Sequence, residues 1–143
     1  MKRYVGIVGS EARKFTDETE RIARREIRRL ICHADVVVSG ACPLGGIDEW
    51  AIEEAKRDGK RTIQHPPKVL RWYDGYRPRN LKIAEDSDEV YCITVRELPP
   101  SYRGMRFDFC YHCGTDEHVK SGGCWTTKKA RELGKVGETI VIG

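Results

Sequence analysis

The stretch from Val36 to Ala51 constrains the fold more than any other part of the chain. It opens with a short apolar, β-branched run, Val36-Val37-Val38, which is typical of a buried strand. A turn with three glycines and one proline follows, and helical spacing begins at Ile47, Trp50 and Ala51. A strand, a glycine-rich turn and a helix start present free backbone N–H groups to an anion, with the positive end of the helix dipole behind them. The stretch therefore predicts an anion-binding turn in an α/β protein.

The rest of the chain repeats this alternation of strand and helix. Apolar runs predict strands at residues 4–8, 36–38, 61–65, 89–95 and 138–142. Helical spacing predicts helices from residue 17 to about 34, over 47–57, from 78 to about 86, and over 125–133. This order favours a single α/β domain over residues 1–143, in which a doubly wound, mainly parallel sheet of about five strands carries helices on both faces. Residues 96–118 break the rhythm and are interpreted as an insertion before the last helix.

The first predicted helix has a start signal and a basic face. Asp17, followed by Glu20 three residues later, resembles a capping box. Five arginines lie mostly opposite the apolar positions of this helix: Arg21, Arg24, Arg25, Arg28 and Arg29. The run favours a solvated outer face of an amphipathic helix, with a nucleic-acid patch as the alternative.

Composition limits the class of protein without choosing a ligand. Of the 143 residues, 39% are hydrophobic and 34% are charged, which suits a soluble protein with a charged surface. No run approaches the roughly 20 apolar residues that a membrane span needs. A strand begins so near the N-terminus that we expect no signal peptide and a cytoplasmic location. The net charge of +4 suits a phosphate-bearing ligand as well as nucleic acid, and a homo-oligomer is left open.

Three loops follow predicted strands at the edge where α/β sheets bind their ligands, the carboxyl ends of the strands. They span residues 9–13, 39–48 and 120–123, and their small residues let the backbone approach a ligand closely. A single glycine-rich loop of this kind is weak evidence, because tight turns need glycine anyway. Three of them in one short chain predict a phosphate or nucleotide pocket.

Several side chains in and beside these loops suit a phosphorylated ligand. Ser121 and the amides of Gly122 and Gly123 can bind a phosphate at the start of the last helix, assisted by Lys120. Arg79, in the first turn of its predicted helix, can grip a phosphate or carboxylate with two parallel hydrogen bonds, which lysine cannot do. Asn80 either bonds a ribose hydroxyl or stabilises the turn.

Aromatic residues offer candidates for stacking on a base. Trp72, Tyr73 and Tyr76 cluster within residues 69–76, a segment whose pattern fits either an extended chain or a short helical turn. Trp50 and Trp125 lie within amphipathic helical patterns, where a core role is more common.

Four sequence patterns taken together resemble the SLOG superfamily. They are Val5-Gly6-Ile7-Val8-Gly9-Ser10; Ser39-Gly40-Ala41 through Gly45-Gly46-Ile47-Asp48 with Ala51; Arg77-Pro78-Arg79-Asn80 with Ala84 and Asp88; and Ser121-Gly122-Gly123. This superfamily includes the Smf/DprA DNA-processing proteins and the Lonely-guy (LOG) nucleotide phosphoribohydrolases. The nearest likeness is to the small, stand-alone YspA-like branch, and it covers nearly the whole chain except residues 96–118. The resemblance implies a Rossmann-like fold that binds nucleotides or nucleotide-derived ligands.

The resemblance also implies ligand-binding positions and puts catalysis in question. The implied positions are Gly9, Ser10, Arg13, Gly40, Gly45, Gly46, Asp48, Arg79, Asn80, Ser121, Gly122 and Gly123, the last three as a phosphate cradle. The LOG hydrolases follow their glycine loop with a catalytic glutamate, whereas no carboxylate occurs here between Lys120 and Glu132. Asp48 and Glu49 remain catalytic candidates, although a helix-capping role is favoured for Asp48.

A Cys/His cluster within the insertion predicts a metal site. Cys110-x2-Cys113-x4-His118-x5-Cys124 supplies four zinc ligands, and the Cys-x2-Cys pair matches the knuckle that places two thiolates on one ion. Four protein ligands would make the zinc structural, in a knuckle-like element of residues 96–118 completed by Cys124. Free thiols and a catalytic zinc are the alternatives. Because no secretion signal is expected, reduced thiols are favoured over disulfides for the six cysteines.

These observations favour a binding or sensor module for a nucleotide or nucleotide-derived small molecule. The alternative is a nucleotide-processing enzyme, a hydrolase or transferase acting at an N-glycosidic or phosphate bond. A third hypothesis is a single-stranded DNA-binding protein of the DNA-processing type, which would use the arginines of the first helix.

Overall fold

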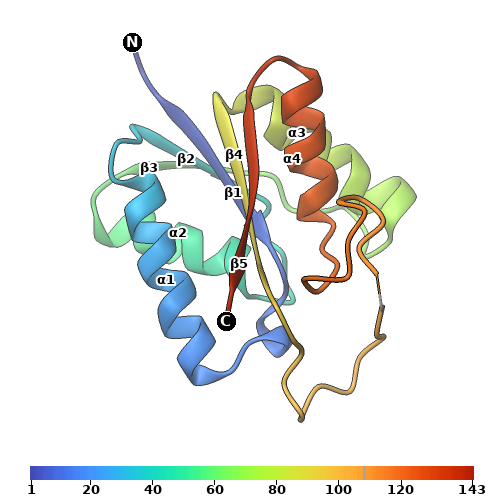
Figure 1. The fold of residues 1–143 in the computed structure, drawn as a ribbon. Coiled ribbons are helices and arrows are strands. Elements are labelled where there is room, and N and C mark those ends of the chain that lie inside the picture. Colours follow the sequence, from blue (N-terminus) through green and yellow to red (C-terminus); the bar gives the residue numbers. More distant parts are fainter. Residues whose placement is uncertain (108) are drawn as a thin grey trace.

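A computed structural model describes residues 1–107 and 109–143 and shows a sheet with helices on both sides (Figure 1). The strands are β1 (Tyr4–Gly9), β2 (Val36–Ser39), β3 (Arg61–Gln64), β4 (Glu89–Val95) and β5 (Val136–Ile142). The α-helices are α1 (Asp17–Ile31), α2 (Ile47–Arg57), α3 (Arg77–Asp86) and α4 (Gly123–Glu132), with a short 3-10 helix η1 (Ala12–Lys14) and a π-helical turn η2 (Trp72–Tyr76). Within these described ranges, no helix has both the length and the apolar character that crossing a membrane requires.

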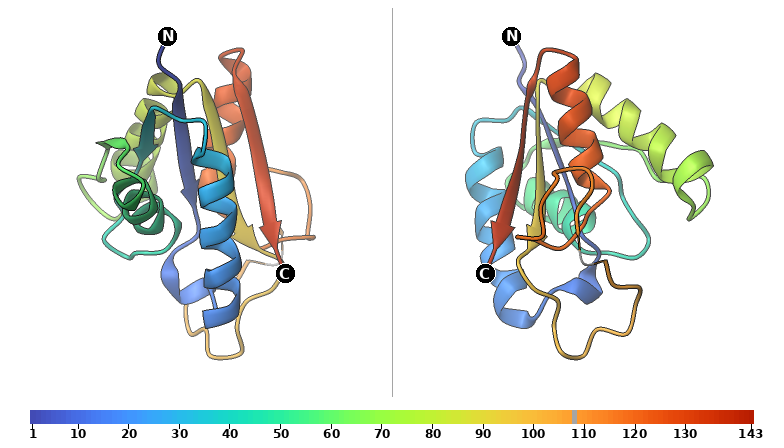
Figure 2. Two further views of the ribbon diagram at one scale, coloured as in Figure 1. Left: turned by 90° about the vertical axis from the view of Figure 1, so that its left-hand side faces the viewer. Right: turned by 45° about the vertical axis from the view of Figure 1, so that its right-hand side comes forward.

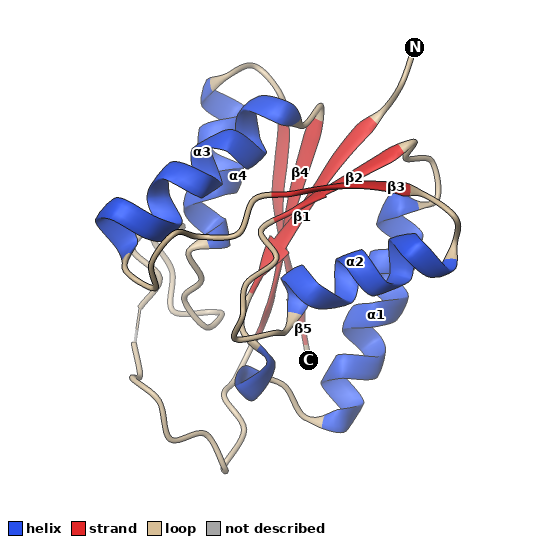
Figure 3. Ribbon diagram, turned by 180° about the vertical axis from the view of Figure 1, so that it is seen from behind, coloured by secondary structure: helices blue, strands red, loops and turns tan. Residues whose placement is uncertain are grey.

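The sheet has the order β3-β2-β1-β4-β5, and every neighbouring pair is parallel. The chain starts at the centre with β1, builds outward to β3, and then crosses to β4 and β5 on the other side. Helices α1 and α2 cover one face (Figure 2), and α3 and α4 cover the other (Figure 3). The prediction of a three-layer, doubly wound α/β fold with a five-stranded parallel sheet is confirmed.

Alternation along the central strands sends apolar side chains into two cores. Val5 and Ile7 of β1 belong to the core cluster that includes residues of α1 and α2. Val8, one position out of phase, belongs with Ile83 of α3 and Ala130 of α4 on the opposite face. Because successive residues of a strand point to opposite faces, a strand covered on both sides must be apolar throughout. This requirement explains the continuous runs that marked β1, β2 and β4 in the sequence.

The start of α1 differs from its prediction by one residue. Thr16 is the N-cap: its Oγ1 accepts a hydrogen bond from the Thr19 N–H at 3.1 Å, and Thr19 Oγ1 accepts one from the Thr16 N–H at 2.8 Å. The capping box predicted for Asp17 and Glu20 is therefore wrong. Thr16 rather than Asp17 caps the helix because the extended backbone at Thr16 directs its hydroxyl toward the first turn. Asp17 lies within that turn, where its charge still favours the helix dipole.

Two arginines of α1 contact α2, although most of the basic run is exposed as predicted. Arg24 and Arg28 donate to the two carboxylate oxygens of the buried Glu54 on α2, at 2.9 Å and 3.1 Å. Arg24 also lies over the Trp50 ring, with its guanidinium carbon 5.3 Å from the ring centroid. Two of the five arginines, Arg24 and Arg28, therefore attach α1 to α2, while Arg29 pairs with Glu26 on α1 itself.

The strand order creates a switch point beside β1. The connection leaving β1 runs toward β2, whereas the connection leaving its other neighbour, β4, leads away to β5. Diverging connections leave a crevice at the carboxyl ends of the two strands, where α/β sheets bind ligands. Residues 96–122, which join β4 to α4, pass over this end of the sheet and form no named helix or strand in their described part (Figure 1).

Candidate functional site

A cavity of about 650 Å³ opens at the carboxyl ends of β1 and β4. Five stretches of chain line it: the end of β1 with the residues after it, the β2–α2 loop with the first turn of α2, residues 70–80 from just before η2 into α3, the β4–α4 connection, and the start of α4. The lining residues are Val8, Gly9, Ser10, Glu11, Lys14, Cys42, Leu44, Asp48, Leu70, Arg71, Trp72, Tyr76, Arg79, Asn80, Met105, Phe107, Lys120, Ser121, Gly122 and Gly123. The cavity therefore lies at the switch point of the sheet.

Most of the site residues expected from the sequence meet at this cavity. Those that line it are Gly9, Ser10, Asp48, Arg79, Asn80, Lys120, Ser121, Gly122 and Gly123. Gly40, Gly45 and Gly46 lie in the β2–α2 loop just before Asp48 but outside the lining, and Glu49 of α2 also lies outside it. Arg13 also lies outside: it is exposed and pairs with Glu11 at 3.0 Å.

Asp48 and Arg79 form a buried ion pair at the cavity. Asp48 Oδ2 lies 3.3 Å from Arg79 Nη2, and the side chains are 3% and 11% exposed. Burial raises the pKa of Asp48, whereas the Arg79 guanidinium and the Cys42 backbone act in the opposite direction. Within the described chain, Asp48 Oδ1 and Arg79 Nε have no hydrogen-bond partner. Buried polar atoms are almost always satisfied, so these two atoms mark a place for a ligand or water.

The capping role expected for Asp48 is wrong. The N-cap of α2 is Gly46, which has no side chain to offer, and Asp48 is the second residue of the helix. Its carboxylate turns to Arg79, while its backbone oxygen accepts a hydrogen bond from Ser39 Oγ at 2.8 Å. The sequence places an acidic residue at the start of α2. Only the packing of α3 beside the start of α2 shows that Asp48 pairs with Arg79.

Two glycines of the β2–α2 loop serve close packing. Arg79 Nη1 donates to the Gly40 backbone oxygen at 2.6 Å, and a Cβ at Gly40 would overlap the guanidinium. Gly46 has a φ of +85°, and a Cβ there would overlap the Ser10 oxygen and the Ala12 nitrogen. Because L-residues rarely adopt this φ, both space and backbone require glycine at position 46. These glycines bring the loops together rather than facing the cavity.

The opposite side of the cavity is cationic. Lys14 and Lys120 both line it, and Lys14 Nζ lies 3.5 Å from the Lys120 backbone oxygen. Burial lowers the pKa of Lys14; neighbouring Lys120 lowers it further, while Glu11 partly offsets both. The N-terminus of α4, with Gly122 as its N-cap, points its dipole at the same region. An anion here would relieve the repulsion between the two ammonium groups.

The turn predicted to act as a phosphate cradle uses one of its two glycine amides internally. The Gly123 N–H donates to Ser121 Oγ at 3.1 Å, so this amide is already engaged. The Gly122 N–H has no hydrogen-bond partner in the described chain and remains free for a ligand. Only the structure shows which of the two N–H groups is free for a ligand, because this depends on the local conformation of the turn.

A hydroxyl relay fixes the end of β1 to the end of the insertion. Ser10 Oγ lies 2.9 Å from Thr94 Oγ1, and Thr94 Oγ1 donates to the Val119 oxygen at 2.9 Å. The Val119 N–H in turn donates to the Val95 oxygen at 2.8 Å. This relay sets the position of Lys120 and Ser121 relative to β1.

Trp72 is the aromatic residue best placed for stacking. It lines the cavity, is 38% exposed, and makes an edge contact with Trp125 at 5.7 Å between ring centroids. Tyr76 also lines the cavity, but Tyr73 is exposed outside it. Trp50 is buried against Phe15, as expected of a core residue.

The sequence analysis did not single out several of the lining residues, among them Lys14, Arg71, Met105 and Phe107. Lys14 directly follows the loop of residues 9–13, so its position in the sequence weakly indicated that it belongs to the site. The other three lie in segments without regular periodicity, and nothing in their spacing points to a pocket. Met105 and Phe107 reach the cavity only because the β4–α4 connection folds back over it.

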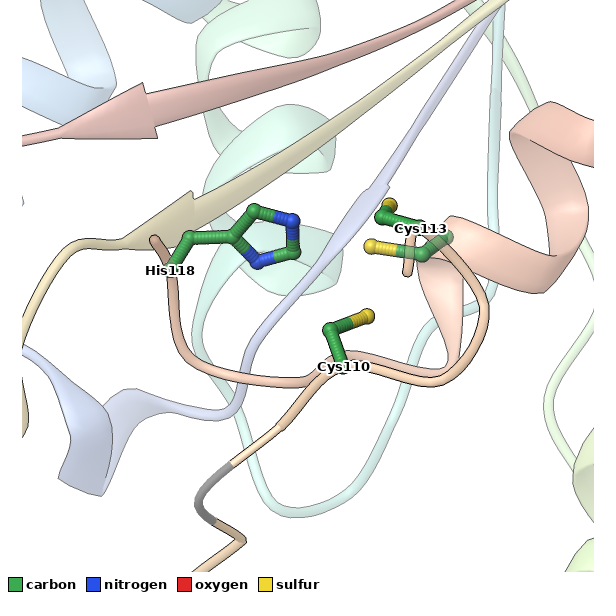
Figure 4. A group of neighbouring side chains, drawn as sticks. Cys110, Cys113 and His118 are labelled. Carbon is green, nitrogen blue, oxygen red and sulfur yellow. The ribbon is translucent and has the colours of Figure 1, made fainter. Parts of the chain in front are cut away.

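The predicted metal ligands converge in the structure. The ligating atoms of Cys110, Cys113, His118 and Cys124 all lie within 4.8 Å of one another, and three of them face a common point in Figure 4. Zn–S bonds of about 2.3 Å in a tetrahedron put sulfurs about 3.8 Å apart, so small side-chain adjustments would seat the ion. His118 Nδ1 lies 3.0 Å from the Val119 oxygen. In the tautomer that donates this bond, Nε2 is free to bind metal. The group can hold a metal ion.

The remaining cysteines lie outside this group. Cys92 is buried in β4, with its Sγ 4.0 Å from that of Cys124. Cys42 is buried in the lining of the cavity, where burial raises the pKa of its thiol, and Cys32 is exposed. All six cysteines are free thiols in the structure.

Solved structures with a similar fold include the following two proteins. The molybdenum cofactor carrier protein of Chlamydomonas reinhardtii aligns over 99% of this chain and 76% of its own, at 15% identity and a TM-score of 0.59. DNA processing protein A (DprA) of Streptococcus pneumoniae aligns over 98% of this chain and 50% of its own, at 18% identity and a TM-score of 0.57. By sequence, no family model and no curated protein matches the chain significantly. The Rossmann-like α/β fold that the SLOG resemblance implied is therefore confirmed for this chain.

Proposed function

We propose that the protein binds a phosphate-bearing, nucleotide-derived small molecule in the cavity at the carboxyl ends of β1 and β4. One observation carries the proposal: Asp48 Oδ1 and Arg79 Nε are buried at this cavity with no hydrogen-bond partner in the described chain. An unpaired buried polar atom costs about 1–3 kcal/mol. A ligand that pairs both atoms would recover that cost as binding energy.

The two sides of the cavity suit two different parts of such a ligand. Lys14, Lys120 and the free Gly122 N–H suit a phosphate at the start of α4. Asp48 Oδ1 accepts hydrogen bonds and Arg79 Nε donates one, which suits ribose hydroxyls or the polar edge of a base. Trp72 offers a ring face to a base. The chemical class is therefore a nucleotide or a related phosphorylated heterocycle.

The solved relatives support this class at a coarse level. By name, one is a carrier of the molybdenum cofactor and the other a DNA-processing protein. The DNA alternative would use the arginines of α1, but Arg24, Arg28 and Arg29 are paired with acidic residues. Among the described residues, the cavity is the better supported binding surface.

Binding can be tested without knowing the ligand. Native mass spectrometry of the purified protein would report a co-purified small molecule, and thermal shift with AMP, GMP and ADP-ribose would follow. A ligand at 100 times its dissociation constant stabilises the fold by about 2.7 kcal/mol. We expect a rise in Tm that is lost in Lys120→Ala and retained in Lys56→Ala, an exposed lysine of α2 that removes the same charge. No co-purified molecule and no shift with any of the three would contradict the proposal, and a shift only with oligonucleotides would favour DNA binding.

We further propose that the ion held by Cys110, Cys113, His118 and Cys124 is a structural Zn²⁺. Three thiolates and one imidazole are a set that zinc prefers, and four protein ligands leave no open position for chemistry. Elemental analysis of protein purified under reducing conditions is expected to give one zinc per chain, lost in Cys113→Ser and retained in Cys32→Ser. Zinc-free protein that takes up no added zinc would contradict this assignment.

A further inference from the structure

We infer that the metal ion closes one wall of the ligand cavity, so that metal occupancy controls ligand binding. The wall consists of residues 105–107 and 109–123, in which the lining residues Met105, Phe107, Lys120, Ser121, Gly122 and Gly123 are found. The inference builds on the proposed function, because it concerns the regulation of that same cavity.

Along the wall, the residues of the metal group alternate with residues that line the cavity. Phe107 lines the cavity, Cys110 and Cys113 belong to the metal group, and His118 follows. The chain then lines the cavity again from Lys120 to Gly123, and the next residue, Cys124, completes the metal group. One ion bound by these four residues would therefore connect the insertion to the first turn of α4. Its ligands His118 and Cys124 flank the lining residues 120–123.

The part of the wall before His118 forms few hydrogen bonds to the rest of the fold, although Cys110 is buried in the core beside α3 and α4. Val119, which follows His118, is held by hydrogen bonds with β4. Among the described residues 97–107 and 109–117, nitrogen–oxygen hydrogen bonds stay within the segment, with one exception: Arg96 Nη1 donates to the Glu117 oxygen at 3.5 Å. A segment held mainly by its own hydrogen bonds opens at low free-energy cost. A metal that binds only the closed arrangement would shift it strongly toward that arrangement.

Aromatic contacts carry the effect of the metal to the ligand position. His112, between the two cysteines of the knuckle, packs on Trp72 at 5.9 Å between ring centroids. Trp72 in turn lies over Gly122, where an added Cβ would be 3.2 Å from its ring. Lys120 Nζ lies 4.3 Å from the Phe107 centroid and 4.9 Å from that of Tyr111. Fixing the knuckle thus fixes Trp72 and Lys120, the stacking face and one of the two lysines.

The first experiment needs no ligand. Hydrogen exchange is compared between zinc-loaded and chelator-stripped protein under reducing conditions, peptide by peptide. We expect zinc to slow exchange in peptides covering residues 109–124 and to leave β2 and β3 unchanged. Stripped Cys32→Ser, an exposed cysteine outside the group, should regain protection with zinc, whereas Cys113→Ser should not. Equal exchange in the two forms, or loss of protection across the whole sheet, would overturn the inference.

The second experiment separates this inference from the proposed function. AMP is titrated into both forms, with tryptophan fluorescence as the readout. If the wall is closed in about one tenth of the stripped molecules, the apparent affinity falls about tenfold on zinc removal. Equal AMP affinity in both forms would overturn the metal inference and leave the binding proposal intact. If neither form binds AMP, that outcome counts against the binding proposal, and the exchange result still decides the role of the metal.

Discussion

Asp48 and Arg79 form a buried ion pair at 3.3 Å, and each keeps one polar atom without a hydrogen-bond partner among the described residues. A pair kept only for stability would normally satisfy all its polar atoms, because desolvating two charges is costly. Asp48 comes from α2 and Arg79 from α3, on opposite faces of the sheet. The pair thus joins the two helical layers at the point where the cavity opens.

Replacing Arg79 by lysine should weaken binding of AMP by about 10- to 100-fold. Lysine keeps the positive charge but loses the planar fork, and with it the free Nε donor. Isothermal titration of the variant against the unaltered protein measures the change. Arg77→Lys is the matched control, because Arg77 is exposed and does not line the cavity. Equal losses in both variants would show that the fork of Arg79 has no special role.

The stability of the protein should carry a pH dependence from Asp48. Burial raises the pKa of this carboxyl above its ordinary 3.8, so the folded state holds the proton more tightly than the unfolded state. The resulting stabilisation is complete below pH 3.8 and is lost as pH rises through the folded pKa. Asp48→Asn lacks this titration. The Tm of the unaltered protein, measured relative to Asp48→Asn, should therefore fall as pH rises above the ordinary 3.8 toward the raised folded pKa, and a constant difference would contradict the shift.

Gly40→Ala should destabilise the protein by about 1–3 kcal/mol, because the new Cβ would overlap the Arg79 guanidinium. A double-mutant cycle with Arg79→Ala isolates this contact, measured by urea unfolding. The cost of the methyl group should be smaller once the guanidinium is gone. It should not vanish, because Asp48 Oδ2 would also lie 2.7 Å from that Cβ. An unchanged cost would place the strain elsewhere.

Glu54→Gln should lower stability by about 1–3 kcal/mol. Burial acts to raise the pKa of Glu54, but hydrogen bonds from Arg24 and Arg28 outweigh it and lower the pKa below the ordinary 4.5. Its stabilisation is therefore present above pH 4.5 and is lost as pH falls through the lowered folded pKa. The matched control is Glu53→Gln, an exposed partner of Arg24, which should cost much less. Chemical unfolding at pH 7 and at pH 3 checks both the size and the pH trend, and equal costs would contradict it.

The sequence alone determined the fold and the edge of the sheet that bears the cavity. Apolar runs such as Val36-Val37-Val38 alternate with amphipathic helices, and this periodicity leaves few topologies for a parallel sheet. The spacing of Cys110, Cys113, His118 and Cys124 predicted a group that does converge. These features are local, since each depends on residues close together in the chain.

Only the tertiary structure decided which partners the site residues take. Asp48 pairs with Arg79 rather than capping its own helix, because α3 brings the guanidinium across the Gly40 backbone. Met105 and Phe107 reach the cavity because the β4–α4 connection folds back over it. Such pairings are set by packing between segments far apart in the chain, so the periodicity of the sequence does not predict them. The glycine-rich stretch identified the site, and the contacts between layers determined its chemistry.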